Sequence, residues 1–147
     1  MDRSKIEDLI REVYKTRTSN DLAAVLNLFA RNAVFHMAGA NGPGRIAARA
    51  EGQQSISDIM ATLVSAWSWI EVQILDLLVD GASAAVRYRA TMRFLPTQAI
   101  VVTDLFDLIK FEDGKIAELV EFCDTALAAS LINDAMSLAG KGAGSAA

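Results

Sequence analysis

The chain has 147 residues, of which 52% are hydrophobic and 22% charged, and its formal net charge is −4. This acidic balance, with no basic stripe interleaved with aromatic residues, argues against a nucleic-acid partner. A single cysteine and a single histidine leave neither an internal disulfide nor a Cys/His cluster with zinc spacing, so we expect no metal site.

No apolar run approaches the roughly 18 residues that a membrane-spanning helix needs. The first residues, MDRSKIEDLIREVYK, are charged and amphipathic, unlike a signal peptide. We therefore expect a cytoplasmic protein without a membrane partner. The length fits one domain, which we place at residues 4–138, followed by a flexible tail at 139–147.

Hydrophobic periodicity predicts helices in the first half of the chain and strands in the second. Ser4 and Glu7 form a capping-box pattern at the start of the first helix. The helix predicted after it spans residues 22–30, and a strand at 33–37 precedes a third helix at 53–67. The remaining elements are strands at 69–78, 84–94, 99–111 and 116–123, and a last helix at 126–138.

The strand at 99–111 is apolar on both of its faces. One face carries Ile100, Val102, Phe106 and Leu108, and the other carries Val101, Leu105, Ile109 and Phe111. One face can line a cavity under the helices, whereas the other needs a separate cover. We expect that cover to be a second copy of the chain, in a homodimer through the outer face of the sheet.

Two segments resemble the SnoaL-like and ketosteroid isomerase-like members of the nuclear transport factor 2-like superfamily. They are NDLAAVLNLFARNAVFHMAG at 20–39 and FDLIKFEDGKIAELVEFCDTALAA at 106–129, and the resemblance extends over residues 4–130. It implies an α+β cystatin-like cone, in which three helices from the first half of the chain pack on a curved mixed or antiparallel sheet that encloses a pocket. The same scaffold hosts isomerases, cyclases, epoxide hydrolases and non-catalytic binding modules.

Asp107 interrupts an apolar strand, where burial of a carboxylate is costly without a partner. The resemblance places it at the oxyanion-hole aspartate of the isomerases, where a raised pKa would keep it protonated. Alternatively, it faces solvent or pairs with an arginine across the sheet. Tyr14, on the core face of the first helix, lies near the position of the second oxyanion-hole donor, although it can also be read as a core tyrosine.

The general base is harder to assign. The resemblance puts Met37 where the isomerases have their proton-shuttling aspartate, and methionine cannot accept that proton. His36 is adjacent and has a suitable intrinsic pKa, but strand alternation turns it to the opposite face unless the strand is bulged. A structural or interface histidine is the alternative.

Glu121 matches an aspartate of the limonene epoxide hydrolase site by its distance from Gly114. A three-residue loop pairing Phe111 with Lys115 would place Glu121 diagonal to Asp107. An ion pair of Glu121 with Arg87 or Arg89 is the alternative role.

Asp124 follows the last strand and has two interpretations. It is either an acid at the pocket mouth, as in the cyclases, or the N-cap of the last helix. The predicted pocket walls are Phe35, Met37, Trp67, Tyr88, Met92 and Leu119.

We expect a small-molecule-binding protein that performs acid–base chemistry on an apolar substrate, as an isomerase, cyclase or hydrolase. No cofactor is expected, because the glycine-rich segment at 39–44 lacks the Gly-Lys-Ser/Thr ending of a phosphate loop. A non-catalytic ligand-binding or protein-interaction module of the same fold remains the alternative.

Overall fold

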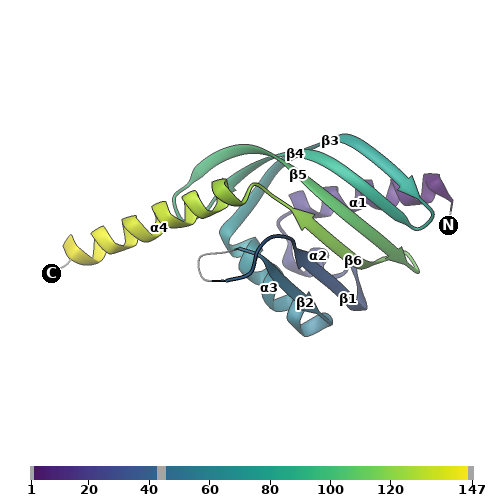
Figure 1. Cartoon of the computed structure of the whole chain (residues 1–147), viewed down its shortest axis with the longest axis horizontal. Helices are drawn as coiled ribbons and strands as arrows, with labels where there is room; N and C mark the ends of the chain where they lie inside the picture. The colour runs from purple at the N-terminus through teal and green to yellow at the C-terminus, as the bar shows by residue number, and fades with distance from the viewer. Residues whose placement is uncertain (1, 43–45, 146–147) are drawn as a thin grey trace.

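A computed structural model describes residues 2–42 and 46–145 of the chain. Residues 43–44 of the glycine-rich segment and the last two residues of the predicted tail lie outside this description. Helices precede a long antiparallel meander, and a last helix projects from one end of the molecule (Figure 1). The elements are α1 (Arg3–Thr18), α2 (Leu22–Leu26), β1 (Phe29–Met37), β2 (Ala48–Glu51), α3 (Gln53–Ala66), β3 (Trp67–Asp80), β4 (Ser83–Phe94), β5 (Ala99–Glu112), β6 (Lys115–Phe122) and α4 (Thr125–Ser145).

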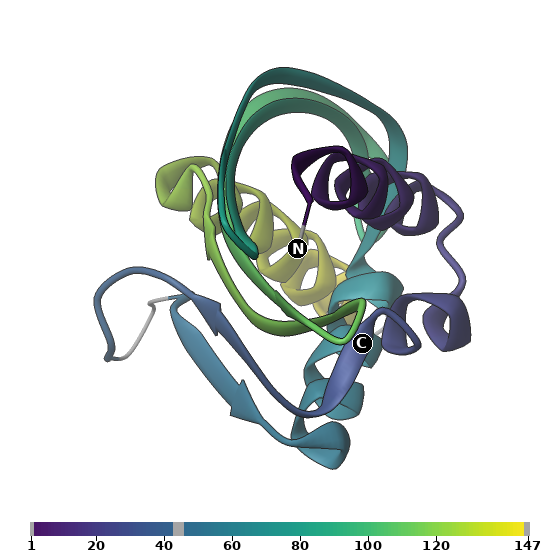
Figure 2. The ribbon, with the colours of Figure 1, turned by 90° about the vertical axis from the view of Figure 1, so that its right-hand side faces the viewer.

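The strands form one curved six-stranded sheet in the order β2-β1-β6-β5-β4-β3. Strands β1 and β6 run parallel, and the other neighbouring pairs are antiparallel. Figure 2 shows β3, β4 and β5 curling over α1, which lies in the concave side of the sheet. The predicted α+β cone with a curved mixed sheet is therefore confirmed.

The inner face of the sheet and the helices share one hydrophobic core. Ile6, Ile10 and Val13 from α1 are buried, because they recur every three to four residues on the helix face toward the sheet. On β5, Leu105 and Ile109 point inward, while Ile100 and Val102 stay exposed on the other face. Burying this inner face positions α1 across the strands that carry the site.

The first helix begins differently from the sequence prediction. Asp2, not Ser4, is the N-cap of α1, and its carboxylate accepts hydrogen bonds from the Ser4 backbone N–H and hydroxyl, each at 3.0 Å. A carboxylate is also favoured by the positive end of the helix dipole. The prediction of a capping box formed by Ser4 and Glu7 was therefore wrong.

The hairpin between β5 and β6 also differs from the prediction. Its loop has two residues, Asp113 and Gly114, both with positive φ, as in the type I′ turn that suits the strand twist. The pairing then shifts by one residue at Ala117, in a β-bulge. As a result, Asp107 lies directly opposite Glu121, rather than facing Leu119 with Glu121 diagonal to it.

Two further boundaries differ from the prediction. Helix α2 ends at Leu26 rather than residue 30, because β1 already begins at Phe29. Helix α4 continues to Ser145, so most of the segment predicted as a flexible tail is helical. Among the described residues, no helix is long and apolar enough to cross a membrane.

Candidate functional site

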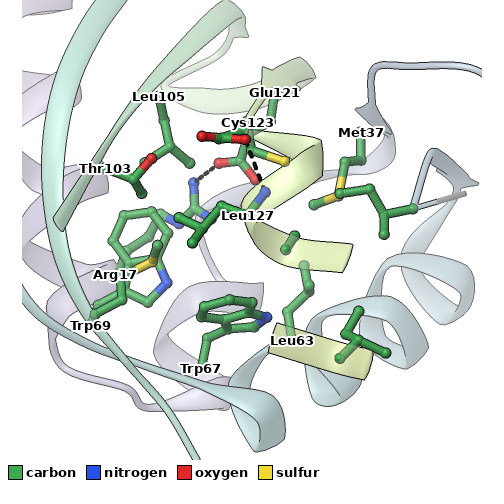
Figure 3. Close-up of a pocket in the computed structure, with 15 residues that line it drawn as sticks. Arg17, Met37, Leu63, Trp67, Trp69, Thr103, Leu105, Glu121, Cys123 and Leu127 are labelled. Atoms are coloured by element: carbon green, nitrogen blue, oxygen red, sulfur yellow. Dashed lines mark hydrogen bonds and ion pairs between the residues drawn. The ribbon is translucent and has the colours of Figure 1, made fainter. Parts of the chain in front are cut away.

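A pocket of about 180 Å³ opens between the concave side of the sheet, α3 and the first turns of α4. Its walls are largely apolar, and Arg17 and Glu121 lie close together within it (Figure 3). The lining residues are Arg17, Met37, Ile46, Leu63, Trp67, Trp69, Met92, Thr103, Leu105, Glu121, Cys123, Asp124, Leu127, Ala128 and Ile132.

The predicted walls divide into two groups. Met37, Trp67 and Met92 line the pocket. The other three predicted wall residues, Phe35, Tyr88 and Leu119, are buried in the core and are not among the lining residues. These three residues belong to the hydrophobic core instead.

Arg17 and Glu121 form a buried ion pair. The Arg17 Nη1 atom lies 2.7 Å from Glu121 Oε1, and only 10% of the Arg17 side chain is exposed. The guanidinium carbon lies 4.1 Å from the centroid of a Trp69 ring, a cation–π contact that holds the guanidinium plane. This pair supplies the charged end of an otherwise apolar pocket.

The backbone of Trp69 is fixed by Asn20. The Asn20 side chain accepts from the Trp69 N–H at 2.8 Å and donates to the Trp69 carbonyl at 3.1 Å. Because β3 is an edge strand, these backbone groups face away from the sheet, and the amide takes the place of a neighbouring strand. Asn20 adopts φ 56°, a left-handed conformation that asparagine tolerates. Asn20 therefore fixes the backbone that carries the Trp69 indole, which contacts Arg17.

Asp107 lies behind this pair, away from the pocket surface. It is 0% exposed, and its Oδ2 accepts a hydrogen bond from the Tyr14 hydroxyl at 2.7 Å. Arg17 Nη1 lies 3.6 Å from the same oxygen. Oδ1 is buried and meets no hydrogen-bond donor among the described residues. A proton on Asp107 would let this carboxyl donate to the Glu121 carboxylate.

The two carboxyls are driven to different protonation states. Burial, and then repulsion from Glu121, raises the pKa of Asp107 well above its ordinary value. Burial also opposes ionisation of Glu121, but the Arg17 charge and hydrogen bonds outweigh it and lower the pKa of Glu121. These opposite shifts favour a proton on Asp107 and an ionised Glu121 beside the Arg17 guanidinium.

Tyr14 and Tyr88 complete the cluster. The Tyr88 hydroxyl donates to Glu121 Oε1 at 2.9 Å, and the two tyrosine rings pack with centroids 4.6 Å apart. Burial and the nearby Asp107 carboxyl raise the pKa of both tyrosines, which keeps their hydroxyls protonated as donors. Tyr14 bonds Asp107 and does not line the pocket, so no open oxyanion hole is formed by these two residues.

The alternative partners predicted for Glu121 lie on the other face of the sheet. Arg87 pairs with Asp76 at 2.6 Å, and Arg89 pairs with Asp104 at 2.8 Å, at exposed positions. Strand alternation explains this, because Arg87 and Arg89 lie at exposed, outward positions of β4, whereas Asp107 lies at a buried, inward position of β5. An ion pair of Glu121 with Arg87 or Arg89 was therefore wrong, and so was a solvent-facing Asp107.

His36 lies outside the cluster. It pairs with Val120 on β6, whereas its neighbour Met37 pairs with Glu121 and lines the pocket. The two side chains therefore leave β1 on opposite faces of the sheet. The structure does not bring His36 together with the other predicted catalytic residues.

Asp124 and Cys123 lie at the junction of β6 and α4. Asp124 lines the pocket, and its Oδ1 accepts from the Leu127 N–H at 3.0 Å, so it also caps α4. Burial, then repulsion from Glu121 and Asp124, raises the pKa of the Cys123 thiol to about 11. Cys123 is thus a neutral lining group, not an activated nucleophile.

Sequence reasoning missed Arg17. The helix stripe that includes Ile10, Val13 and Tyr14 continues to Arg17, three residues further on the same face. A charged residue that prolongs a buried stripe needs a buried counter-charge, and this signal was available from the sequence. Its partner Glu121 was identified as a site residue, but not as the partner of Arg17.

A domain model described as "SnoaL-like domain" matches residues 10–119. No curated protein matches the sequence. Similar solved structures include a putative isomerase from Bacillus subtilis, with TM-score 0.72 and 16% identity over 82% of this chain and 87% of that one. Another is SalBIII, an epoxide hydrolase/cyclase-like enzyme of pyran ring formation in salinomycin. Its TM-score is 0.69 and its identity 21%, and the alignment covers 85% of this chain and 95% of that one.

A third similar structure is a putative polyketide cyclase from Sinorhizobium meliloti, which is 27% identical. Its TM-score is 0.58, and the alignment covers 78% of this chain and 93% of that one. The isomerase and SalBIII are each less than 25% identical, so these two likenesses bear on the fold alone. The family match covers most of the chain and agrees with the observed cone, so the protein belongs to the SnoaL-like domain family.

Proposed function

We propose that the protein binds an apolar small molecule in this pocket and removes a proton from it at Glu121. The observation that carries the proposal is the position of Glu121, which lines the pocket and is also bonded to the buried cluster behind it. The Glu121 carboxylate stays ionised and can accept a proton, although its lowered pKa makes it a weaker base than a carboxylate whose pKa is raised toward the working pH. The similar solved structure described as a putative polyketide cyclase, which is 27% identical, is consistent with this class of chemistry.

Charge moves in a balanced way in the proposed step. A C–H bond next to a ligand carbonyl breaks, its proton passes to Glu121, and its electron pair moves to the ligand oxygen. Glu121 then no longer neutralises Arg17, whose Nη1 lies 2.7 Å away. The freed guanidinium charge stabilises the developing oxyanion in a site shielded from water. Arg17 therefore couples the proton transfer to Glu121 with the development of negative charge on the ligand oxygen.

Asp107 has a supporting role in this mechanism. It does not line the pocket, so it does not meet the ligand. Its neutral carboxyl can donate to Glu121, and its Oδ2 is held by Tyr14 at 2.7 Å. These contacts fix the Glu121 carboxylate and keep the cluster free of excess negative charge. Asp107 and Tyr14 are positioning residues in this proposal.

Hydrogen–deuterium exchange of a cyclic ketone tests the proposal without knowledge of the natural substrate. The α-protons of 4-tert-butylcyclohexanone are followed by NMR in D₂O with and without the protein. We expect the protein to accelerate exchange, and Glu121→Gln to reduce that acceleration about 10²–10⁴-fold, the usual contribution of a general base. Glu121→Asp, which keeps the charge on a shorter side chain, should retain part of it.

The control is Asp104→Asn, which removes an exposed carboxylate on the outer face of β5, outside the pocket lining. Its exchange rate should stay close to that of the unaltered protein. Equal acceleration by the protein and by folded Glu121→Gln would contradict the role of Glu121. Saturable ketone binding without any acceleration would favour the alternative, a non-catalytic ligand-binding module.

We also propose that two copies associate through the outer face of the sheet. Ile100, Val102, Phe106, Leu108 and Phe122 are exposed there on β5 and β6, a group of large apolar side chains that is unusual on a monomer. The neighbouring charges on β3, β4 and β5 already pair with one another within the chain. An apolar face of this kind suits a self-complementary, two-fold interface. The cytoplasm remains the predicted location of this dimer, which cell fractionation would test.

A further inference from the structure

The volume of the pocket limits the size of its ligand. The pocket holds about 180 Å³. An apolar cavity of roughly 150 Å³ takes up a molecule of the size of benzene. One ring with a few substituent atoms therefore fills a pocket of this volume, whereas a fused four-ring molecule would extend well beyond it.

The lining limits the polarity of the ligand. The lining includes Trp67, Trp69 and Met92 from the sheet and Leu127 and Ile132 from α4, so most of the ligand surface would meet apolar atoms. The polar lining is confined to few side chains, as in sites that orient an apolar ligand by one or two groups. The ligand is thus apolar over most of its surface, with its polar part at Arg17.

The charges at that end are already matched. Arg17 is neutralised by Glu121 at 2.7 Å, and Asp124 adds a further carboxylate to the lining. An anionic ligand would meet Glu121 and Asp124, and a cationic ligand would meet the Arg17 guanidinium. An anion would gain no unpaired counter-ion to offset the loss of its hydration. A cation would find Asp124 in the lining, but the Asp124 carboxylate already accepts from the Leu127 N–H at the start of α4. An uncharged ligand avoids this cost.

Arg17 still has donors to offer. The guanidinium has five N–H groups, and among the described residues it donates one hydrogen bond, to Glu121. Its contact with Trp69 at 4.1 Å keeps the plane in place, so the remaining donors are fixed before a ligand arrives. A ligand oxygen with free lone pairs is the natural acceptor.

We propose that the substrate is an uncharged, single-ring-sized molecule whose carbonyl oxygen accepts a hydrogen bond from Arg17. This inference rests on the proposed function, because it names the substrate class for the same site. The oxygen that Arg17 binds is the one on which the mechanism places negative charge.

A matched set of probes tests the ligand class by binding alone. The probes are 4-tert-butylcyclohexanone, 4-tert-butylcyclohexanecarboxylate and 4-tert-butylcyclohexylamine in its ammonium form, with androst-4-ene-3,17-dione as a fused four-ring ketone. The chain has two tryptophans, Trp67 and Trp69, and both line the pocket, so intrinsic fluorescence reports on binding there. We expect the single-ring ketone to bind at least tenfold more tightly than each of the other three probes.

Equal or tighter binding of the carboxylate, the ammonium or the four-ring ketone would overturn the proposal. The size argument has its own variant, Ala128→Leu, which narrows the pocket from α4. It should weaken ketone binding at least tenfold, whereas Ala126→Leu, at an exposed position of the same helix outside the lining, should not. Ketone binding that is unchanged in folded Ala128→Leu would place the ligand elsewhere and also contradict the proposal.

These outcomes are separate from those of the exchange experiment. The ligand class fails if the order of probe affinities is wrong, whether or not any proton is exchanged. The proposed function fails if exchange does not depend on Glu121, even when the ketone binds as expected.

Discussion

Asp107 and Glu121 lie directly opposite each other on β5 and β6, yet their pKa values move in opposite directions. The difference arises from what surrounds each carboxyl, since Glu121 is 2.7 Å from Arg17 Nη1 and Asp107 is 3.6 Å from it. Pairs of acids separated in this way divide into one proton donor and one acceptor. The arrangement makes stability, as well as chemistry, dependent on pH.

Asp107→Asn should flatten the pH dependence of stability. Burial raises the pKa of Asp107, so the folded chain holds this proton more tightly than the unfolded chain does. The resulting stabilisation is fully present below about pH 4, the unfolded pKa, and is lost as the pH rises through the folded pKa. Asparagine has no such proton. As the pH rises, the free energy of unfolding of the variant should therefore increase relative to that of the unaltered protein, by up to about 1.4 kcal/mol per pH unit.

Urea unfolding between pH 5 and 9, followed by tryptophan fluorescence, measures this difference. The control is Asp104→Asn, on the same strand with a carboxylate that is 43% exposed. Its free energy of unfolding should run parallel to that of the unaltered protein. A constant offset between Asp107→Asn and the unaltered protein would show that Asp107 is ionised throughout.

Arg17→Met should destabilise the fold more at pH 8 than at pH 5. Without the guanidinium, Glu121 loses the charge that holds its pKa down, and an unpaired buried charge costs about 3–5 kcal/mol. A raised folded pKa means that stability is recovered as the pH falls, because Glu121 can then take up a proton. Arg11→Met, at a position whose side chain is 64% exposed, should cost about 0–1 kcal/mol at both pH values.

Asn20→Gly and Asn20→Ala should separate the hydrogen bonds of this residue from its backbone conformation. Each loses the two hydrogen bonds to Trp69, at about 1 kcal/mol per bond. Alanine pays about 1 kcal/mol more, because φ is 56° at this position and glycine accepts that conformation freely. Chemical unfolding measures both losses. Equal stability of the two variants would show that the left-handed turn relaxes without strain.

Val102→Lys should weaken the proposed dimer. Val102 is 62% exposed on the outer face of β5, where a lysine would place like charges against each other across a two-fold interface. Light scattering at micromolar concentration should show a dimer for the unaltered protein and a monomer for the variant. Ser55→Lys, at an exposed position of α3, should remain dimeric. A monomer for the unaltered protein would contradict the dimer itself.

Much of the fold follows from local patterns in the sequence. The alternation along residues 99–111 correctly separates an inner from an outer face, and Asp107 appears as a polar interruption of the inner one. The three-to-four-residue spacing of Ile6, Ile10 and Val13 likewise identifies the buried face of α1. These patterns are local, because a strand or helix shows its buried side within a few residues.

The make-up of the charged cluster depended on contacts between distant parts of the chain. Arg17 and Glu121 are 104 positions apart, and they meet only because α1 packs into the concave side of the sheet. The pairing of Asp107 with Glu121 depends on the two-residue turn and the bulge at Ala117, and a shift of one residue would have separated them.

The sequence by itself identified Asp107 as a candidate acid, because it interrupts an apolar strand, but left open whether it faces solvent. Whether that acid faces a ligand, and which cation balances its neighbour, was decided by the tertiary structure. The local sequence pattern indicates which side of an element is buried. Which charged groups pair with one another depends instead on the register and packing of elements that are remote in sequence.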